Sequence, residues 1–295
     1  MRYRVWSETL ALPELSSPEH VALLKHFRVE VLVAVRPWQL EEARTAFTQL
    51  QQAGIYAAAW PMLADADGRW ASVASMRKFI VFASEVIEAL APAELILDLE
   101  PAFDRMRNWK ALRAAPSTEV DDVLAFREAA AQLRHACQRW QINAAQHRQP
   151  LRLSTAIIPL VAFEPNFPMC RWWQRALGTP VDALPAAAHS VMAYTSLLEG
   201  WSRGLVSRRR AEWLLALIAK RAKRKWGAAG AVSLGTVAPG AFGDEPSYRD
   251  VAELAKDVAI VREAGIQEIA LFDLGGIMQT AAPESWLHAL TSVTR

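Results

Sequence analysis

Short apolar segments alternate with longer amphipathic segments along the whole chain, and this alternation limits the possible folds more than any other feature. The run Val29–Val35 is almost continuously apolar and β-branched, as expected for a strand covered on both faces. In Trp38–Ala53, which follows, apolar residues recur at helical spacing, and Gly54 supplies a helix-ending residue. Repeated strand–helix alternation of this kind is typical of a parallel sheet with helical crossovers.

Eight such units can be read along the 295 residues. The expected strands are Tyr3–Ser7, Val29–Val35, Ile55–Ala59, Leu95–Glu100, Leu151–Ile157, His189–Tyr194, Ala231–Val237 and Glu268–Leu274. The expected helices include Trp38–Ala53, Met76–Leu90, Thr118–Gln146, Ser207–Trp226 and Ser247–Ala264. We predict an α/β fold, a single (β/α)₈ TIM barrel with long βα loops that forms one domain over residues 1–295. A doubly wound open sheet is the main alternative, but no Gly-x-Gly-x-x-Gly turn follows a predicted strand.

Composition excludes several classes of protein. The formal net charge of +2 gives no general case for nucleic acid or a membrane, and no apolar run reaches the length of a spanning helix. The two cysteines, Cys137 and Cys170, suit a reducing compartment, and residues 1–8 lack the apolar core of a signal peptide. We therefore expect a cytoplasmic protein with a carbohydrate or small-molecule substrate and neither a nucleic-acid nor a membrane partner.

Two carboxylates stand at the end of the fourth predicted strand, in the segment Leu95–Pro101. Asp98 and Glu100 share a face because side chains alternate along a strand, and their backbones are separated by about 6.6 Å. Like charges that are desolvated together hold one proton more tightly, which suits general acid catalysis. The alternative is a pair of solvated acids, or acids that cap a following helix.

The carboxyl ends of the other predicted strands carry further polar and aromatic residues, and active sites of such barrels lie at these ends. The candidates are Trp6 and Glu8 after the first strand, Arg36 after the second, Trp60 after the third, Tyr194 on the sixth, Thr236 on the seventh and Asp273 on the eighth. Asp273 is an alternative second carboxylate for Glu100, so the stereochemical outcome stays open.

Aromatic residues are frequent in the predicted loops, and the chain has twelve tryptophans in all. Those in or near the segments after strands three to six are Trp60, Trp70, Trp109, Trp172, Trp173 and Trp201. Indole rings stack on the apolar faces of sugar rings, whereas the alternative for each ring is packing between strands and helices. Together with the carboxylates, they favour a carbohydrate site in which Trp60, Trp70 and Trp109 contact substrate.

Leu97–Pro101 resembles the end of the strand-four motif Asp-x-x-Asp-x-Asp-x-Glu of family 18 glycoside hydrolases, the chitinase-like TIM barrels, and Val191–Tyr194 resembles their strand-six Met-x-Tyr. The resemblance implies cleavage of an N-acetylated sugar chain assisted by the substrate's own acetamido group. Glu100 would protonate the leaving oxygen, Asp98 would orient the acetamido group, and Tyr194 would hydrogen-bond its carbonyl. Family 25 lysozyme-like barrels also carry Asp-x-Glu on a strand.

The chain departs from the family 18 pattern at several positions. The two earlier acids of the motif are replaced by Ala93 and Ile96, and Thr195 stands where an Asp commonly follows the tyrosine. The strand-eight tryptophan is replaced by the region Phe272-Asp273. A catalytically inactive barrel that binds carbohydrate or a protein partner is therefore one alternative function.

A second alternative is an isomerase or lyase that acts on a phosphorylated or carboxylated metabolite. Gly275-Gly276 could expose backbone N–H groups to a phosphate, and Arg36 could bind an anion, although a tight turn also explains the two glycines. No metal or cofactor is predicted, since most histidines lie on expected helices, as do the lysines. The basic stretch Arg203–Lys225 is interpreted as a solvated helix face, with nucleic acid or an acidic partner as its alternative.

Overall fold

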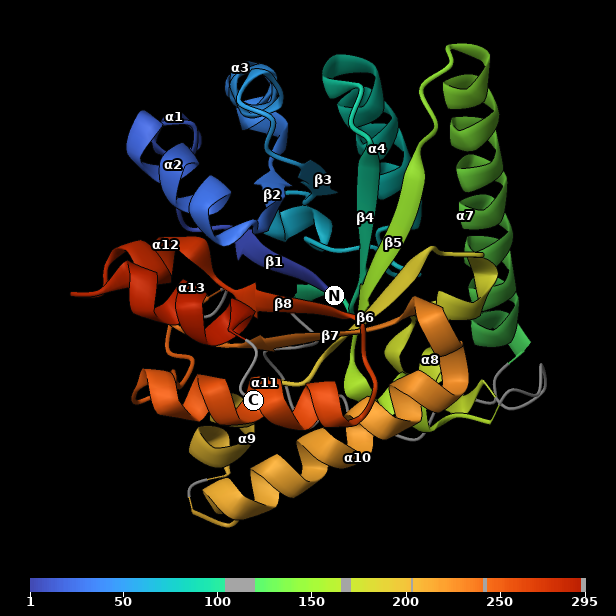
Figure 1. Cartoon of the computed structure of the whole chain (residues 1–295). Helices are drawn as coiled ribbons and strands as arrows, with labels where there is room; N and C mark the ends of the chain where they lie inside the picture. Colours follow the sequence, from blue (N-terminus) through green and yellow to red (C-terminus); the bar gives the residue numbers. More distant parts are fainter. Residues whose placement is uncertain (104–119, 166–170, 203, 241–242, 293–295) are drawn as a thin grey trace. The chain divides into compact units, whose positions relative to one another are not determined.

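A computed structural model describes residues 1–103, 120–165, 171–202, 204–240 and 243–292 of the chain. The eight strands are hydrogen-bonded in sequence order and close into a barrel (Figure 1). The pairs β1–β2, β1–β8, β3–β4, β4–β5, β6–β7 and β7–β8 are parallel. The predicted (β/α)₈ barrel is confirmed.

The strands follow the predicted ones closely. They are β1 (Arg2–Ser7), β2 (Glu30–Val35), β3 (Ala57–Pro61), β4 (Glu94–Leu99), β5 (Arg152–Ile157), β6 (Ala188–Met192), β7 (Gly230–Gly235) and β8 (Glu268–Phe272). The largest shift is in β3, which begins two residues later than expected because the turn at Gly54 continues through Ile55, whose N–H still bonds back to Leu50.

Helices and short 3₁₀ turns connect the strands. The α-helices are α1 (Leu12–Leu15), α2 (Pro18–Phe27), α3 (Leu40–Gln52), α4 (Met76–Leu90), α7 (Val120–Gln146), α8 (Trp172–Leu177), α9 (Thr195–Trp201), α10 (Arg208–Trp226), α11 (Val251–Glu263), α12 (Leu274–Met278) and α13 (Pro283–Thr291). The 3₁₀ turns are η1 (Pro37–Gln39), η2 (Asp65–Asp67), η3 (Pro159–Phe163), η4 (Val181–Ala183) and η5 (Gly227–Ala229). None of these described helices is long and apolar enough to cross a membrane.

Contacts within the barrel divide the chain into two compact units. The first unit comprises Met1–Ala34, Thr45–Ala57 and His189–Arg295, and the second comprises Val35–Arg44 and Ala58–Ala188. The organisation of residues 1–295 as one domain stays a prediction.

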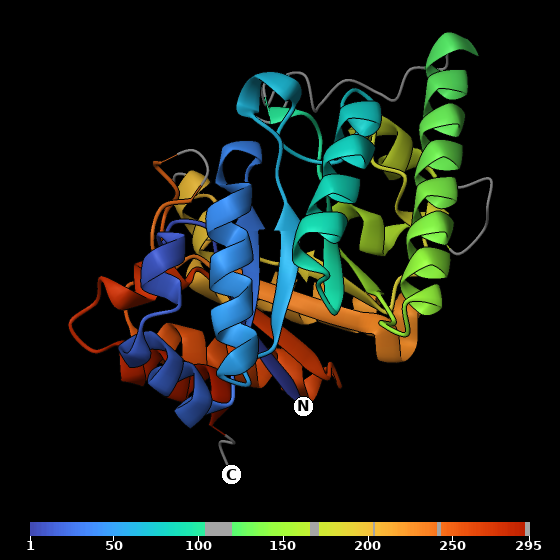
Figure 2. The ribbon, with the colours of Figure 1, turned by 90° about the horizontal axis from the view of Figure 1, so that it is seen from above.

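The second unit is built on β4 and β5, with α4 packed against α7. All six residues of β4 are buried, and its register pairs Asp98 with Ala156 of β5. The buried residues of α4 recur at helical spacing, which gives the helix one apolar face. Figure 2 shows α4 and α7 side by side, and the indole of Trp140 on α7 donates a hydrogen bond to Ser84 of α4.

The first unit contains a buried charged network between α9, α10 and α11 that the sequence analysis does not predict. Asp257 is fully buried, and its carboxylate accepts hydrogen bonds from Arg208 at 2.7 Å, from Tyr248 at 2.8 Å and from Thr195. Arg208 also donates to Thr195 at 2.8 Å and to the carbonyl of Glu253 at 3.0 Å. These contacts join three helices whose apolar faces cover the strands.

Candidate functional site

The side chains of β3 and β4 meet at Asp98. The indole Nε1 of Trp60 donates a hydrogen bond to Oδ2 of Asp98 across 3.1 Å. Both side chains are buried, and the backbone carbonyl of Asp98 accepts a hydrogen bond of 2.9 Å from the N–H of Ala71. Because its carboxylate and its main chain are both held, the position of Asp98 is set by the two strands and the loop that follows β3.

The sequence predicted that Glu100 is the last residue of the fourth strand. In the structure it lies just beyond β4, which ends at Leu99. Pro101 follows it and has no N–H to donate to a strand ladder, so the strand ends at Leu99. Glu100 is 9% exposed and Asp98 only 1%. Of the two carboxylates, Glu100 is therefore the one that a substrate can reach more easily.

The loop after β3 is held by a second cluster of polar and aromatic contacts. Arg69 is buried, its guanidinium lies over the rings of Trp70 and Phe103 at 5.5 and 5.2 Å, and it forms an ion pair with Asp65 at 3.0 Å. Arg36 donates to the carbonyl of Leu63 at 2.6 Å. Arg36 was predicted to bind an anionic substrate. In the structure its hydrogen bond to Leu63 helps to hold the loop after β3.

The predicted tryptophans differ in their exposure to solvent. Trp60 and Trp70 are buried, at 4% and 3% exposed, and the prediction that they contact substrate stays a prediction. Trp109 lies outside the described residues. Among the described residues of this unit, Trp38 is 67% exposed and Trp172 is 43% exposed. Trp38, which lies in η1 two residues after Arg36, is a candidate that the sequence pattern did not indicate.

Two candidates at strand ends of the first unit are buried or paired. Trp6 is 2% exposed, and its indole donates a hydrogen bond to Ser233 at 3.0 Å, so its contacts are with the strands and not with an open site. Tyr194 is half-buried and stacks on Phe272 with ring centroids 6.0 Å apart. Glu8, after β1, is also half-buried, and its role in substrate binding stays a prediction.

Asp273 and Thr236 are used by the fold itself. The carboxylate of Asp273, fully buried, accepts hydrogen bonds from the backbone of Thr9 at 3.0 Å, from its hydroxyl at 2.7 Å and from the N–H of Gly276 at 2.9 Å. Thr236 is 1% exposed and donates to the carbonyl of Pro246 at 2.8 Å. Both side chains are thus held by contacts within the fold, and their roles as second catalytic carboxylate and substrate contact stay predictions.

The same contacts weigh against a phosphate site at Gly275-Gly276. Asp273 caps the N-terminus of α12. Its carboxylate already accepts the hydrogen bond from the N–H of Gly276 that a phosphate would need. A Cβ on Gly276 would lie 2.5 Å from the Cβ of Ala238 and 2.9 Å from its backbone N. The two glycines are explained by close packing against neighbouring main chain.

We therefore expect Gly276→Ala to lower the free energy of unfolding by about 1–3 kcal/mol, because the added methyl meets backbone that cannot move freely. Chemical denaturation measures this change. Gln279→Ala, at an exposed position just after α12, is the control and should change stability by less than about 0.5 kcal/mol. A Gly276→Ala variant as stable as the parent would show that there is space for an anion here.

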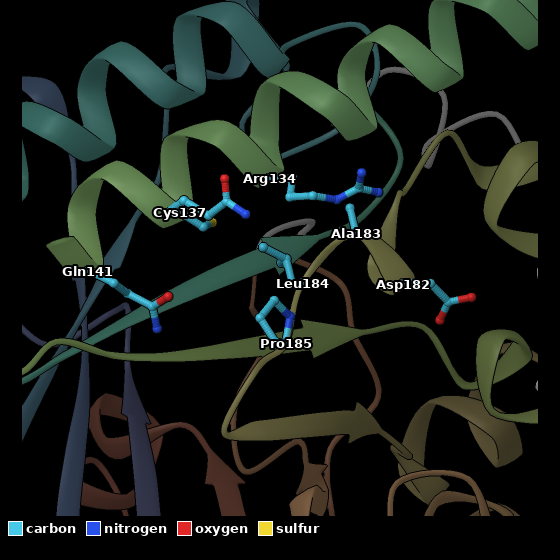
Figure 3. Close-up of a pocket in the computed structure, with 8 residues that line it drawn as sticks. Arg134, Cys137, Gln141, Asp182, Ala183, Leu184 and Pro185 are labelled. Atoms are coloured by element: carbon cyan, nitrogen blue, oxygen red, sulfur yellow. The ribbon is translucent and has the colours of Figure 1, made fainter.

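A pocket of about 360 Å³ lies elsewhere in the second unit, between α7 and the segment that begins at η4 (Figure 3). Its lining includes Arg134, Cys137 and Asp182, and the carboxylate of Asp182 accepts a hydrogen bond of 2.9 Å from Gln174. Burial raises the pKa of Cys137 to about 12, so its thiol is protonated at neutral pH and is a poor nucleophile. We do not assign the candidate chemistry to this pocket, since it holds a single carboxylate.

Among the described residues, no group of three or more His, Cys, Asp or Glu side chains is arranged to hold a metal ion. The chemistry available at the end of β4 is that of two carboxylates, of which one is held in place by an indole N–H. Such a pair can position one polar group of a substrate and exchange a proton with another.

Comparison with known proteins shows similarity of fold. No protein-family model and no curated protein matches the sequence. The glycoside hydrolase domain of PgaB (BpsB) from Bordetella bronchiseptica superposes with a TM-score of 0.62 at 10% identity, over 100% of both chains. A family 18 chitinase from Cycas revoluta, in complex with allosamidin, gives 0.60 at 10% identity over 99% of both. The catalytic domain of a chitinase from Pyrococcus furiosus gives 0.55 at 11% identity, over 100% of this chain and 97% of the other.

The fold of this chain is thus similar to that of glycoside hydrolase barrels, including family 18 chitinases. This agrees with the resemblance seen in Leu97–Pro101 and Val191–Tyr194.

Proposed function

We propose that this chain is a glycoside hydrolase that cleaves a sugar linkage, with Glu100 as the general acid. The observation that carries the proposal is the buried pair Asp98 and Glu100 at the end of β4, in which Trp60 holds Asp98 and leaves Glu100 the more accessible. The similarity to glycoside hydrolase barrels supports the same reaction class.

In the proposed reaction the substrate is an N-acetylated oligosaccharide. Glu100 gives its proton to the glycosidic oxygen while the C1–O bond breaks, and the acetamido carbonyl oxygen of the substrate bonds to C1. Asp98 orients the acetamido group and stabilises the positive charge that develops there. Water then attacks C1, Glu100 takes a proton from it, and the acetamido group is released, so the configuration at C1 is retained.

The roles in substrate binding given to Tyr194 and Glu8 from the sequence remain predictions. Trp172, already a candidate from the sequence, and Trp38 are proposed to stack on sugar rings, because their side chains are exposed. A cytoplasmic location, and the absence of a cofactor, remain predictions.

The test compares three substrates. The chain is incubated with a chitin tetrasaccharide, with the same tetrasaccharide after removal of its acetyl groups and with a cellulose tetrasaccharide, and products are followed by mass spectrometry. We expect cleavage of the acetylated sugar alone, because only that substrate supplies the carbonyl oxygen.

Equal cleavage of the deacetylated sugar would contradict the role given to the acetamido group. Binding without cleavage of any of the three would favour the inactive, carbohydrate-binding barrel. The metabolite isomerase or lyase is the less favoured alternative, because the N–H of Gly276 is already bonded to Asp273.

A further inference from the structure

The helix α10 concentrates positive charge on the first unit. It carries eight basic residues and one acidic residue, a formal charge of +7, whereas the whole chain carries +2. The single acid, Glu212, is only 8% exposed and lies between Arg208 at 3.1 Å and Lys256 at 2.7 Å. The acid therefore does little to reduce the charge on the outward side of the helix.

The exposed residues of α10 form one stripe along the helix. They are Arg209, Arg210, Trp213, Lys220, Arg221 and Arg224, and no acidic residue is among them. Positions 209, 213, 220 and 224 fall on one face because their spacings of four and seven residues are close to one and two helical turns. The opposite face is buried, with Ala211, Leu215 and Ile218 among its members. The basic stripe is therefore exposed, while the opposite face of the helix packs against its own unit.

Large apolar side chains project at the N-terminal end of this stripe. Leu205 is 79% exposed and Trp213 is 64% exposed, and Trp201 at the end of α9 is 37% exposed. Arg210 donates to the carbonyl of Leu205 at 3.1 Å, so the turn that carries Leu205 is held against the first turn of α10. Three large, exposed apolar side chains thus accompany the N-terminal part of a row of cations.

We propose that this surface, the stripe of α10 together with Leu205 and Trp201, binds an anionic lipid bilayer. Lysine and arginine side chains at the stripe's positions neutralise lipid head groups, and tryptophan is favoured at the boundary between head groups and acyl chains. The apolar end identifies the occupant, because a nucleic acid would satisfy the cations but offers nothing for Leu205 to enter. The chain would lie on the bilayer without crossing it. This proposal differs from the earlier prediction, made from the overall charge, that the chain has no membrane partner.

The test uses the full chain and vesicles made of phosphatidylcholine with or without about 30% phosphatidylserine, with binding measured by co-sedimentation. We expect binding to the anionic vesicles that weakens as salt is raised, because the attraction is screened. The triple variant Arg209→Gln, Lys220→Gln and Arg224→Gln should bind about 100-fold more weakly, since each cation contributes about fivefold at such a surface.

The matched control removes the same charge from another exposed helix, α7, with Arg127→Gln, Arg134→Gln and Arg139→Gln. This variant should bind anionic vesicles within about threefold of the parent. Leu205→Ser with Trp213→Ala should weaken binding at high salt as well as at low salt, because these side chains enter the bilayer. Circular dichroism checks that every variant is folded.

Three outcomes would overturn the proposal. In the first, the chain does not bind anionic vesicles. In the second, both triple variants lose vesicle binding equally. In the third, the α10 stripe binds a 20-base-pair DNA or RNA duplex more tightly than it binds the vesicles. The last outcome would assign the surface to nucleic acid. None of these measurements depends on hydrolysis, so they separate this proposal from the proposed function.

Discussion

Glu100→Gln should lower the rate of chitin tetrasaccharide cleavage by about 10²–10⁴-fold, the usual contribution of a general acid. Glutamine keeps the shape of the side chain but has no proton to give to the leaving oxygen. The loss should fall on kcat, with KM changed little, because binding of the sugar does not need that proton. Initial rates over a range of substrate concentrations, with denaturation curves for both proteins, measure the two effects separately.

Glu94→Gln is the matched control for this variant, since Glu94 lies at the other end of the same strand. It is fully buried and bonds to Ser154 at 2.5 Å and to Arg152 at 3.4 Å. We expect Glu94→Gln to lower stability while kcat stays within a few-fold of the parent. A Glu100→Gln variant that retained full kcat would remove Glu100 from the mechanism.

Asp257→Asn should lower the free energy of unfolding by about 3–5 kcal/mol, the effect of removing one partner from a buried ion pair. Asp257 is fully buried and bonds to Arg208 at 2.7 Å and to Tyr248 at 2.8 Å. The NH₂ group of asparagine meets hydrogen-bond donors at a place where a carboxylate oxygen accepted them. Denaturant titration of the folded protein measures the change.

Asp250→Asn is the control for this prediction, because it makes the same chemical change at the exposed beginning of the same helix. Asp250 caps α11 by accepting a hydrogen bond from the N–H of Glu253 at 3.0 Å, and asparagine caps a helix about as well. This variant should change stability by less than about 0.5 kcal/mol. Equal effects at positions 250 and 257 would show that the buried network contributes nothing particular to stability.

The pH dependence gives a second check on Asp257. Burial raises its pKa from 3.8, while the bonds from Thr195, Arg208 and Tyr248 act to lower it. The folded state thus holds the proton of Asp257 more tightly than the unfolded state. This tighter binding adds most to stability below pH 3.8, and the added stability is lost as the pH rises through the pKa of the folded state. The difference in stability between the parent and Asp257→Asn should therefore not shrink when the pH is lowered from 7 to 5.

The buried network also shows what a sequence pattern does not reveal. Arg208 and Asp257 are 49 residues apart, and each stands in a helix where a charged residue is ordinarily on the surface. Nothing local distinguishes them from the solvated neighbours Arg209 and Lys256. By contrast, the apolar spacing of Met76–Leu90 predicts a helix that the structure shows with the same bounds, because the period of a helix is a local property.

At the candidate site, too, the sequence identified some residues, while only the structure showed what they contact. Asp98 and Glu100 could be singled out because they interrupt an apolar strand, and a carboxylate in such a strand needs an explanation. The neighbouring Trp60 could be named as a candidate, but its role could not, since the same indole can stack on a sugar or donate to a carboxylate. The distance of 3.1 Å from its Nε1 to Asp98 shows that the indole donates to the carboxylate, while its contact with a sugar stays a prediction.

By itself, the sequence determined the alternation of strands and helices, hence the (β/α)₈ barrel, and the strand that ends in two acids. These follow from the period and the chemistry of residues close together in the chain. Only the tertiary structure decided which polar residues are used up by the fold, as Asp273 is by Thr9 and Gly276, and which side chains remain exposed, as Trp213 does. The physical reason is that hydrogen-bond partners and burial depend on where distant segments pass, and no local pattern records this.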